Sequence, residues 1–375
     1  MIYLDYSANT PADSRVLERF CEVERSFPGN ANSRHQAGRD AKRVIDHATQ
    51  SIAGLLSAQP AEVIYTSGAS EANNFALKGL AKLSRHLGKH IISTPLEHSS
   101  VSGTLTALQE QGYEIDLVDI KRDGTIDLDH LKELLRPDTI AMAVTMVDSE
   151  LGVVQPVQEI AEILKEYPHC HLHVDATQAV GKIPVSFEGV DTMSLTAHKF
   201  YGLNGIGLLL KRRNLALEPL IHGGESTTIY RSGTPTVALA SSLALALELA
   251  VEQLPEHAEA VQKANTFLRT ELTKYPKVHI NSPENAIPHI LNLSVQDVKG
   301  TVFQRELNEE GVCVSVKSAC SSDGLPSRAV FAVSRDRRNA LSSWRVSLSH
   351  RTTEEDLRGF LAAFDRCYRG LTGTK

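Results

Sequence analysis

The residues from Ser194 to Gly202 combine the side chains with the clearest chemical potential in this sequence. The order is Ser-Leu-Thr-Ala-His-Lys-Phe-Tyr-Gly, so a short apolar strand leads into His198, Lys199 and a glycine-bearing turn. A lysine at a strand end can hold an aldehyde cofactor, such as pyridoxal phosphate (PLP), as a Schiff base. The ordinary alternative is a lysine whose ammonium group lies in water. Other residues must decide between the two.

A carboxylate and an amide end the preceding strand, in the sequence His171-Leu-His-Val-Asp-Ala-Thr-Gln178. Asp175 can pair with a protonated pyridine nitrogen and keep such a cofactor electron-withdrawing. Gln178, one helical turn later, can reach the phenolic oxygen of the same ring. The histidines and the cysteine within residues 169–173 also suggest zinc. Alternate side chains of a strand point to opposite faces, so we interpret them as scaffold residues and predict no metal site.

Three further segments have groups that suit a phosphorylated ring. His98 follows a strand near residues 90–94 and can stack on a planar ring or shuttle a proton, although a structural histidine is the alternative. Ser67–Ser70 join a strand to a helix, an arrangement that presents backbone N–H groups to a phosphate or simply caps the helix. The turn Arg231–Pro235 can add donors. The chain has no GxGxxG or Walker pattern, which disfavours dinucleotide and nucleoside triphosphate binding.

Two residues near the C-terminus suit a group-transfer reaction on a carboxylate substrate. Cys320 lies among Ser, Asp and Gly, with Lys317 one turn away, where a thiolate would be exposed. Such a thiol is unusual for a transaminase and suits an enzyme that takes an atom from its substrate and carries it elsewhere. Arg345 lies in an alternating strand; its planar fork matches an α-carboxylate, and a cross-strand salt bridge is the alternative.

The elements that must position these residues alternate between strands and helices. The expected strands cover residues 63–66, 90–94, 114–118, 140–147, 171–174, 192–195 and 206–210, and helices separate most of them. This alternation predicts a mostly parallel sheet with helices on both faces. Ligands of such sheets bind beyond the carboxyl ends of the strands, where the candidate residues fall.

The pattern changes after Gly224. Two helices are expected over residues 237–254 and 257–275, followed by shorter strands over 290–293, 312–315 and 344–348. We predict a large cofactor-binding domain over residues 12–255. Residues 1–11 and 256–375 are predicted to form a smaller α+β domain that carries the cysteine loop, at about residues 316–335.

Composition narrows the class of protein. The 375 residues have a formal charge of −6, which argues against a nucleic-acid or anionic-membrane binder. The sequence has no apolar run of the ~18 residues that a membrane span needs. Residues 1–6 read as a strand rather than a signal peptide. The five cysteines form no CxxC pair, so we expect a reduced, cytoplasmic protein with a thiol available for chemistry.

Taken in order, these motifs closely resemble the cysteine desulfurases of the NifS/IscS kind, which are class V, fold-type I PLP enzymes. The matching segments span residues 4 to about 350 and are Leu4–Ala8, Thr66–Glu71, Glu97–His98, His173–Gln178, His198–Gly207, His222–Gly224, Arg231–Thr234 and Ser318–Cys320. The Ser-Ala-Cys context resembles the subgroup with the longer cysteine loop (group I). The resemblance implies a seven-stranded large-domain sheet and a homodimer.

The resemblance also implies roles for individual residues. Lys199 would hold PLP, His98 would stack on its ring and act as acid and base, and Asp175 and Gln178 would contact the pyridine nitrogen and the phenolic oxygen. The phosphate would be bound by Ala69, Ser70, Thr196 and His198, with Thr234 from the partner subunit. Asn30 and Arg345 would bind the carboxylate of L-cysteine. Cys320 would take its sulfur as a persulfide, release L-alanine, and deliver the sulfur to an acceptor in iron–sulfur cluster assembly or in tRNA or cofactor thiolation.

The sequence departs from the family pattern at three places. Ser149 replaces a common Asn beside the ring oxygen, and Ala197 replaces a common Gly. Glu225-Ser226-Thr227 follows His222-Gly-Gly where a further Gly and a Gln or His are usual. The alternative functions are a selenocysteine lyase or another class V lyase, and, in a different class, a non-catalytic sulfur-relay protein.

Overall fold

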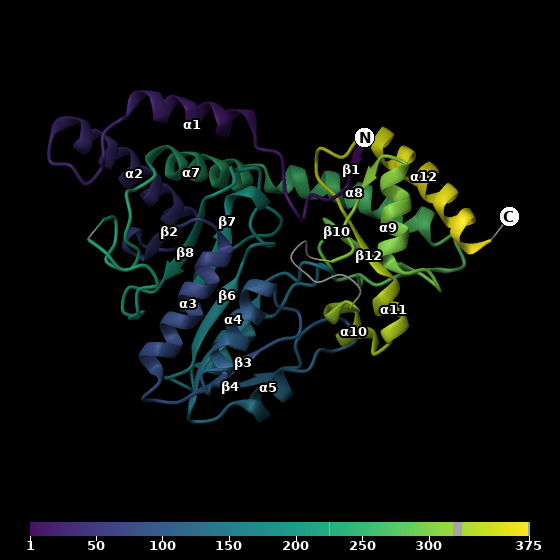
Figure 1. The fold of residues 1–375 in the computed structure, drawn as a ribbon, viewed down its shortest axis with the longest axis horizontal. Coiled ribbons are helices and arrows are strands. Elements are labelled where there is room, and N and C mark those ends of the chain that lie inside the picture. The colour runs from purple at the N-terminus through teal and green to yellow at the C-terminus, as the bar shows by residue number, and fades with distance from the viewer. Residues whose placement is uncertain (225, 318–324, 374–375) are drawn as a thin grey trace.

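A seven-stranded sheet forms the centre of the larger part of the molecule (Figure 1). The computed structural model describes residues 1–224, 226–317 and 325–373. In the sheet order β2-β8-β7-β6-β5-β3-β4, only β8 runs antiparallel to its neighbours. The strands are β2 (Val63–Thr66), β3 (His90–Ser93), β4 (Glu114–Leu117), β5 (Thr139–Thr145), β6 (His171–Asp175), β7 (Thr192–Thr196) and β8 (Gly207–Lys211). The predicted mostly parallel, seven-stranded sheet is confirmed.

Helices cover both faces of this sheet because successive strand residues point to opposite sides. Ile91 packs in the cluster that includes α3 and α4, whereas Ile92 packs in the cluster on the other face with α2, α6 and α7. The helices of this part are α1 (Ser14–Ser26), α2 (Gln36–Leu55), α3 (Ala69–Ser84), α4 (Ser99–Gln109), α5 (Leu128–Leu134), α6 (Val157–Leu164) and α7 (Val237–Glu252).

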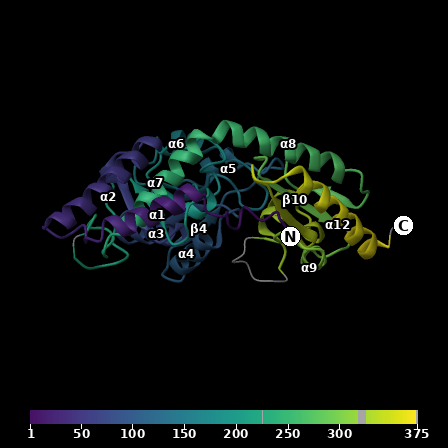
Figure 2. The same cartoon turned by 90° about the horizontal axis from the view of Figure 1, so that it is seen from above.

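A second, antiparallel sheet has its own core. Its order is β12-β10-β9, and Trp344 stacks on Phe303 beside Phe360 and Phe364. The elements of this C-terminal part of the chain are α8 (Leu254–Leu272), β9 (Val278–Ile280), β10 (Ile290–Val295), α9 (Gly300–Glu309), β11 (Val312–Cys313), α10 (Arg328–Ser334), α11 (Arg337–Ser342), β12 (Ser343–Ser347) and α12 (Glu354–Thr372). Figure 2 shows α8 extending from α7 along one side of the molecule.

The N-terminal residues lie with the C-terminal elements rather than with the large sheet. β1 (Ile2–Tyr3) pairs in parallel with β11, and Asp5 forms an isolated bridge with Ser347. Most apolar side chains of the C-terminal elements form a core of their own, although Ile290 and the buried residues of α10 pack in the core of the large sheet. This second core and the β1–β11 pairing support the predicted division into residues 12–255 and residues 1–11 with 256–375, which stays a prediction.

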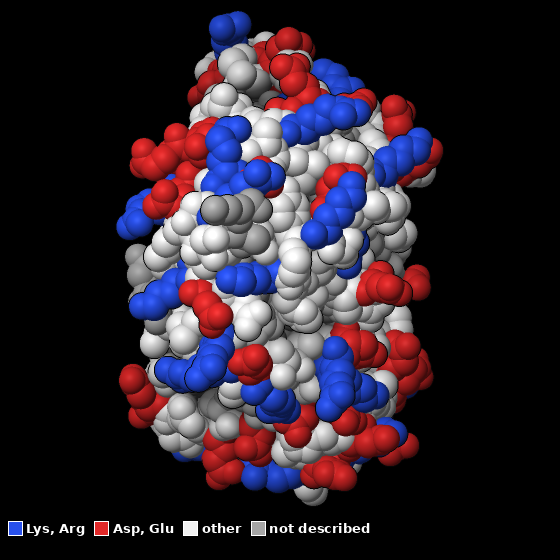
Figure 3. Space-filling view, turned by 90° about the vertical axis from the view of Figure 1, so that its right-hand side faces the viewer, with Lys and Arg blue, Asp and Glu red and all other residues white. Residues whose placement is uncertain are grey.

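Charge is mixed over the end of the molecule that lies at the right of Figure 1. Figure 3 shows Lys and Arg side chains interspersed with Asp and Glu across this face. Among the described residues, no single helix is both long and apolar enough to cross a membrane; α7 and α8 meet those criteria only as a pair bent by 65°.

Candidate active site

A cavity of about 360 Å³ lies at the carboxyl ends of the large-sheet strands. Most of the predicted site residues line it: Ala69, Ser70, His98, Ser149, Asp175, Gln178, Thr196, His198, Lys199 and Arg345. They come from the ends of different strands and from β12 of the second sheet, so the cavity lies where the two sheets approach each other.

Lys199 ends a short 3₁₀ turn (Ala197–Lys199) that follows β7. Its Nζ donates hydrogen bonds to the carbonyl oxygens of Ser7 (2.7 Å) and Ala8 (2.6 Å). Thr10 supports the turn, because its backbone N–H and its hydroxyl both donate to the carbonyl of His198. The N-terminal segment therefore holds the lysine at the cavity, and Ser7 and Ala8 contribute through backbone oxygens that the sequence does not distinguish.

Asp175 is the last residue of β6 and is almost completely buried. One carboxylate oxygen accepts from the backbone N–H of Thr177 at 2.9 Å, and the other accepts from Nδ2 of Asn73 at 2.9 Å. A buried carboxylate needs such donors to offset the loss of hydration. Asn73, in α3, was missed by the sequence reasoning.

Gln178 is bonded within the protein at both ends of its amide. Nε2 donates to the carbonyl of Ser7 at 2.9 Å, and Oε1 accepts from Nζ of Lys182 at 2.9 Å. Lys182 is also buried, and burial, followed by the positive charges of Lys199 and Arg345, lowers its pKa from 10.5 to about 7. Lys182 was not predicted from the sequence, because a lysine after a glycine reads as a surface residue.

The N-terminus of α3 opens on the cavity without a side-chain cap. Gly68 precedes it at φ 155°, a backbone conformation that favours glycine, and Gly207 of β8 packs so closely that an added Cβ would lie 2.6 Å from the Gly68 Cα. The first N–H groups of Ala69 and Ser70 are thus available to an anion. His198 lies nearby, and burial, then the charges of Lys199 and Lys182, lower its pKa to about 4.

His98 is the N-cap residue of α4 and lines the cavity. Its Nδ1 accepts from the backbone N–H of Ser100 at 3.1 Å and lies 2.9 Å from the Ser100 hydroxyl oxygen. Burial lowers the pKa of His98, against an opposing effect of the Asp175 charge. The imidazole is therefore neutral at pH 7.

Arg345 reaches the cavity from β12 and is buried. Nη1 donates to the carbonyl of Ser149 at 2.6 Å, and Nη2 pairs with Asp5 at 3.1 Å. Asp5 lies in the segment that bridges to Ser347 of β12, so the cross-strand salt bridge considered from the sequence does form, and it ties Arg345 to the N-terminal segment. Its Nε is buried without a partner among the described residues.

Two predicted residues do not line this cavity. Thr234 lines a different one, beside Thr66 and Ser67, which agrees with its predicted role in the partner's site but does not test it. The side-chain oxygen of Asn30 accepts from the backbone N–H of Asn32, within its own turn. Cys320 and Glu225 lie outside the described residues.

The cavity fits a planar, phosphorylated ring. The buried hydroxyls of Ser7 and Thr177 line it and have no hydrogen-bond partner among the described residues, so they are available to a polar ligand. An uncapped helix N-terminus, a buried carboxylate and a lysine surround the same space. These are the donors and acceptors that a phosphate, a pyridine nitrogen and an aldehyde carbon need.

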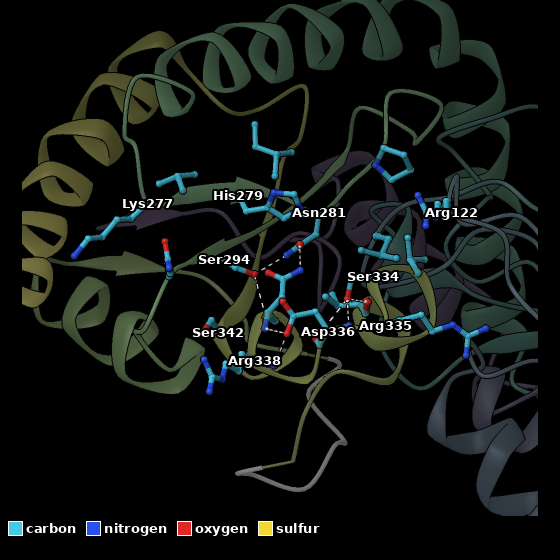
Figure 4. A pocket seen from close by; sticks show the side chains of 18 of the residues that line it. Arg122, Lys277, His279, Asn281, Ser294, Ser334, Arg335, Asp336, Arg338 and Ser342 are labelled. Carbon is cyan, nitrogen blue, oxygen red and sulfur yellow. Dashed lines mark hydrogen bonds between the residues drawn. The ribbon is translucent and has the colours of Figure 1, made fainter.

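A larger hollow of about 1070 Å³ lies elsewhere, between the second sheet and α10–α11 (Figure 4). Three of its polar side chains bond to one another: Nδ2 of Asn281 donates to Ser294, and Asn339 donates to Asn281. These groups are already satisfied, so we place the chemistry in the smaller cavity. In the described part of the chain, no three His, Cys, Asp or Glu side chains converge as metal ligands.

The buried Lys182 predicts an unusual pH dependence of stability. Its pKa is 10.5 when exposed and about 7 in the folded protein, so between these values only the unfolded chain binds the proton. The free energy of unfolding should therefore rise with pH across this window, by at most about 1.4 kcal/mol per pH unit. The full cost of burying the charged lysine is present below pH 7. In Lys182→Met, urea unfolding from pH 6 to pH 10 should lack this rise.

Lys165→Met is the matched control, because Lys165 pairs with Glu162 at an exposed site. It reports the effect of removing one positive charge. If Lys182→Met and Lys165→Met give the same pH profile, the burial cost assigned to Lys182 is wrong.

Known proteins share both the sequence and the fold. The family model for class V aminotransferases matches residues 2–360. The cysteine desulfurase IscS of Dictyoglomus turgidum is 38% identical over 375 residues, which cover 99% of this chain and 95% of that protein. The cysteine desulfurase IscS of Proteus mirabilis is 38% identical over 365 residues, covering 95% of this chain and 90% of that protein.

Solved structures of similar proteins have the same fold as this chain. A structure described as a NifS-like protein has a TM-score of 0.92 and 33% identity, with both chains fully covered. A structure of SspA in complex with cysteine has a TM-score of 0.83 and 31% identity, covering 94% of this chain and all of that one. The chain belongs to the class V aminotransferase family and, within it, to the NifS/IscS cysteine desulfurases.

Proposed function

We propose that this protein is a PLP-dependent cysteine desulfurase that converts L-cysteine to L-alanine and holds the released sulfur as a persulfide on Cys320. The observation that carries the proposal is the convergence of Lys199, Asp175 and His98 with the free N-terminus of α3 in one cavity. Family membership supports the same reaction.

When bound, PLP withdraws electrons from the substrate carbon atoms. The residues of the chain hold it and move protons around it. Asp175 keeps the pyridine nitrogen protonated, the N–H groups of Ala69 and Ser70 bind the phosphate, and Lys199 Nζ is the covalent anchor and a proton carrier. In the structure, Nε2 of Gln178 donates to the Ser7 carbonyl and Oε1 accepts from Lys182, so the second N–H of the amide would be the donor to the ring oxygen.

The substrate is bound through its carboxylate and loses its sulfur to the chain. Arg345 is the carboxylate ligand that the geometry supports, because its guanidinium lines the cavity and its Nε is unpartnered among the described residues. Asn30 is proposed as the second ligand on the family pattern alone. The Cys320 thiolate attacks the substrate sulfur; the C–S bond breaks, its electron pair stays on carbon, and protonation of that carbon yields alanine.

We further propose that the enzyme is a cytoplasmic homodimer that passes sulfur to an acceptor protein of iron–sulfur cluster assembly or of thiolation. Its described cysteines, Cys21, Cys170, Cys313 and Cys367, are free thiols, which supports a reducing compartment. Thr234 lines a separate pocket and not the cavity of its own chain, which supports its use in the site of a partner subunit.

The anchor role of Lys199 predicts a coloured protein. The purified protein should be yellow, and borohydride should fix PLP on Lys199, as read by mass spectrometry of its peptides. Lys182 is the internal control, because it is also buried and carries an amine. A colourless protein, or PLP fixed on Lys182, would contradict the assignment.

The nucleophile role of Cys320 predicts that Cys320→Ala loses alanine formation from L-cysteine by roughly a thousandfold or more, since no other group takes the sulfur. Absorbance should show unchanged PLP binding. Cys21→Ala, a change in the half-buried Cys21 of α1, should retain full activity. Full sulfur release by Cys320→Ala would contradict the proposed mechanism.

The proposed contact of Thr234 with the partner's phosphate predicts weaker cofactor binding in Thr234→Ala. A hydrogen bond to a charged group is worth about 1.5–3 kcal/mol, so the Kd for PLP should rise roughly 10-fold to 100-fold. Thr236→Ala is the matched control, because the Thr236 side chain makes no capping bond to α7. A monomer in sedimentation, or equal affinities in the two variants, would refute the contact.

A further inference from the structure

Asn73 links two of the proposed active-site residues through one buried amide. It lies in the second turn of α3 with no exposed surface. Nδ2 donates to the carboxylate of Asp175 and to the hydroxyl oxygen of Ser100, both at 2.9 Å. Oδ1 accepts from the hydroxyl of Ser194 and lies 2.9 Å from Nε2 of His173. All four hydrogen-bonding positions of the amide are thus used.

The direction of this amide follows from its partners. A carboxylate that is ionised can only accept, so the atom facing Asp175 must be the nitrogen, and Oδ1 must face His173. Nε2 of His173 therefore carries the proton, and Nδ1 accepts from the hydroxyl of Thr192 at 2.9 Å. Burial lowers the pKa of His173 to about 4, so the ring is neutral and this single arrangement holds at pH 7.

A second branch runs from Asn73 to His98. The Ser100 hydroxyl accepts from Asn73 and lies 2.9 Å from Nδ1 of His98, and it donates its own proton to that nitrogen if Nδ1 is unprotonated. The backbone N–H of Ser100 donates to the same Nδ1, and an N–H group cannot accept. Nδ1 is therefore unprotonated, and the proton of the neutral ring lies on Nε2, which has no partner among the described residues.

We propose that Asn73 is a positioning residue for the proposed desulfurase reaction: it orients the Asp175 carboxylate directly and, by donating to the Ser100 hydroxyl, keeps the proton of that hydroxyl directed at Nδ1 of His98. One amide on α3 thus sets two groups that come from different strands. As a consequence, His98 meets the cofactor and substrate as a hydrogen-bond donor and must give up its Nε2 proton before that atom can accept one. This inference rests on the proposed function only for its effect on turnover.

The test compares Asn73→Ala with Asn74→Ala. Asn74 is the next residue of the same helix, and its amide donates only to the Ser70 carbonyl in the first turn. ¹⁵N spectra of ring-labelled histidine, assigned with His98→Gln, report the tautomer in protein with and without PLP. All three proteins should show His98 protonated at Nε2, because the Ser100 backbone N–H still donates to Nδ1. In Asn73→Ala the Nδ1 signal should shift, because the Ser100 hydroxyl loses the donor that directs its proton to Nδ1, whereas Asn74→Ala should match the parent.

Turnover and cofactor spectra complete the test. Removal of a residue that orients a functional group typically costs 10-fold to 100-fold, so kcat of Asn73→Ala should fall by about that factor with KM for L-cysteine little changed. The pH titration of the bound PLP absorbance should shift in Asn73→Ala and not in Asn74→Ala, because Asp175 loses a donor.

Ser100→Ala separates the two branches and removes only one side-chain hydroxyl, so it should fold. It should reproduce the change at His98 and leave the PLP titration as in the parent. The proposal is overturned if the His98 Nδ1 signal is the same as in the parent in both Asn73→Ala and Ser100→Ala, or if kcat of folded Asn73→Ala lies within twofold of Asn74→Ala. The spectra of cofactor-free protein decide the positioning role even if the chain has no desulfurase activity.

Discussion

The buried carboxylate of Asp175 is the constraint on which the site depends. A charge that has lost its water must be surrounded by donors, and here the donors are the Thr177 backbone and the Asn73 amide. Asn73 in turn requires Ser194 of β7, His173 of β6 and Ser100 of α4 to be in place. Satisfying one carboxylate therefore fixes the relative positions of β6, β7, α3 and α4 at the edge where the cavity opens.

A second set of contacts brings together parts of the chain that the large sheet does not contain. The carbonyls of Ser7 and Ala8 receive Lys199, and Arg345 enters from the second sheet, held by Asp5 and Ser149. The large sheet thus supplies the cofactor-binding groups, and the remaining sequence supplies the group proposed for the substrate carboxylate. Binding and chemistry are divided between two cores that meet at the cavity.

The sequence predicted the sheet and most of the cavity because these features are local. A strand that ends in Asp175, or a small-residue turn before α3, is visible in a few adjacent letters. Lys182 and Ser7 were missed because their roles depend on neighbours distant in the chain. The sequence contained one indication of a role for Asn73, because it is a polar residue among the apolar positions Ala72, Phe75 and Ala76. Only the tertiary contacts show which groups it forms hydrogen bonds with. Helix α1 was missed because it buries few side chains, chiefly Val16 and Val23.

The position of the first ten residues also bears on how the protein is made. They precede both sheets in the sequence, yet Tyr3 pairs with Cys313, Asp5 bridges to Ser347, and Thr10 holds the turn that contains Lys199. During translation the large sheet can form while its lysine still lacks the Ser7 and Ala8 carbonyls in their final place. The cavity can be completed only after residues as far as β12 have left the ribosome, because Arg345 pairs with Asp5 there.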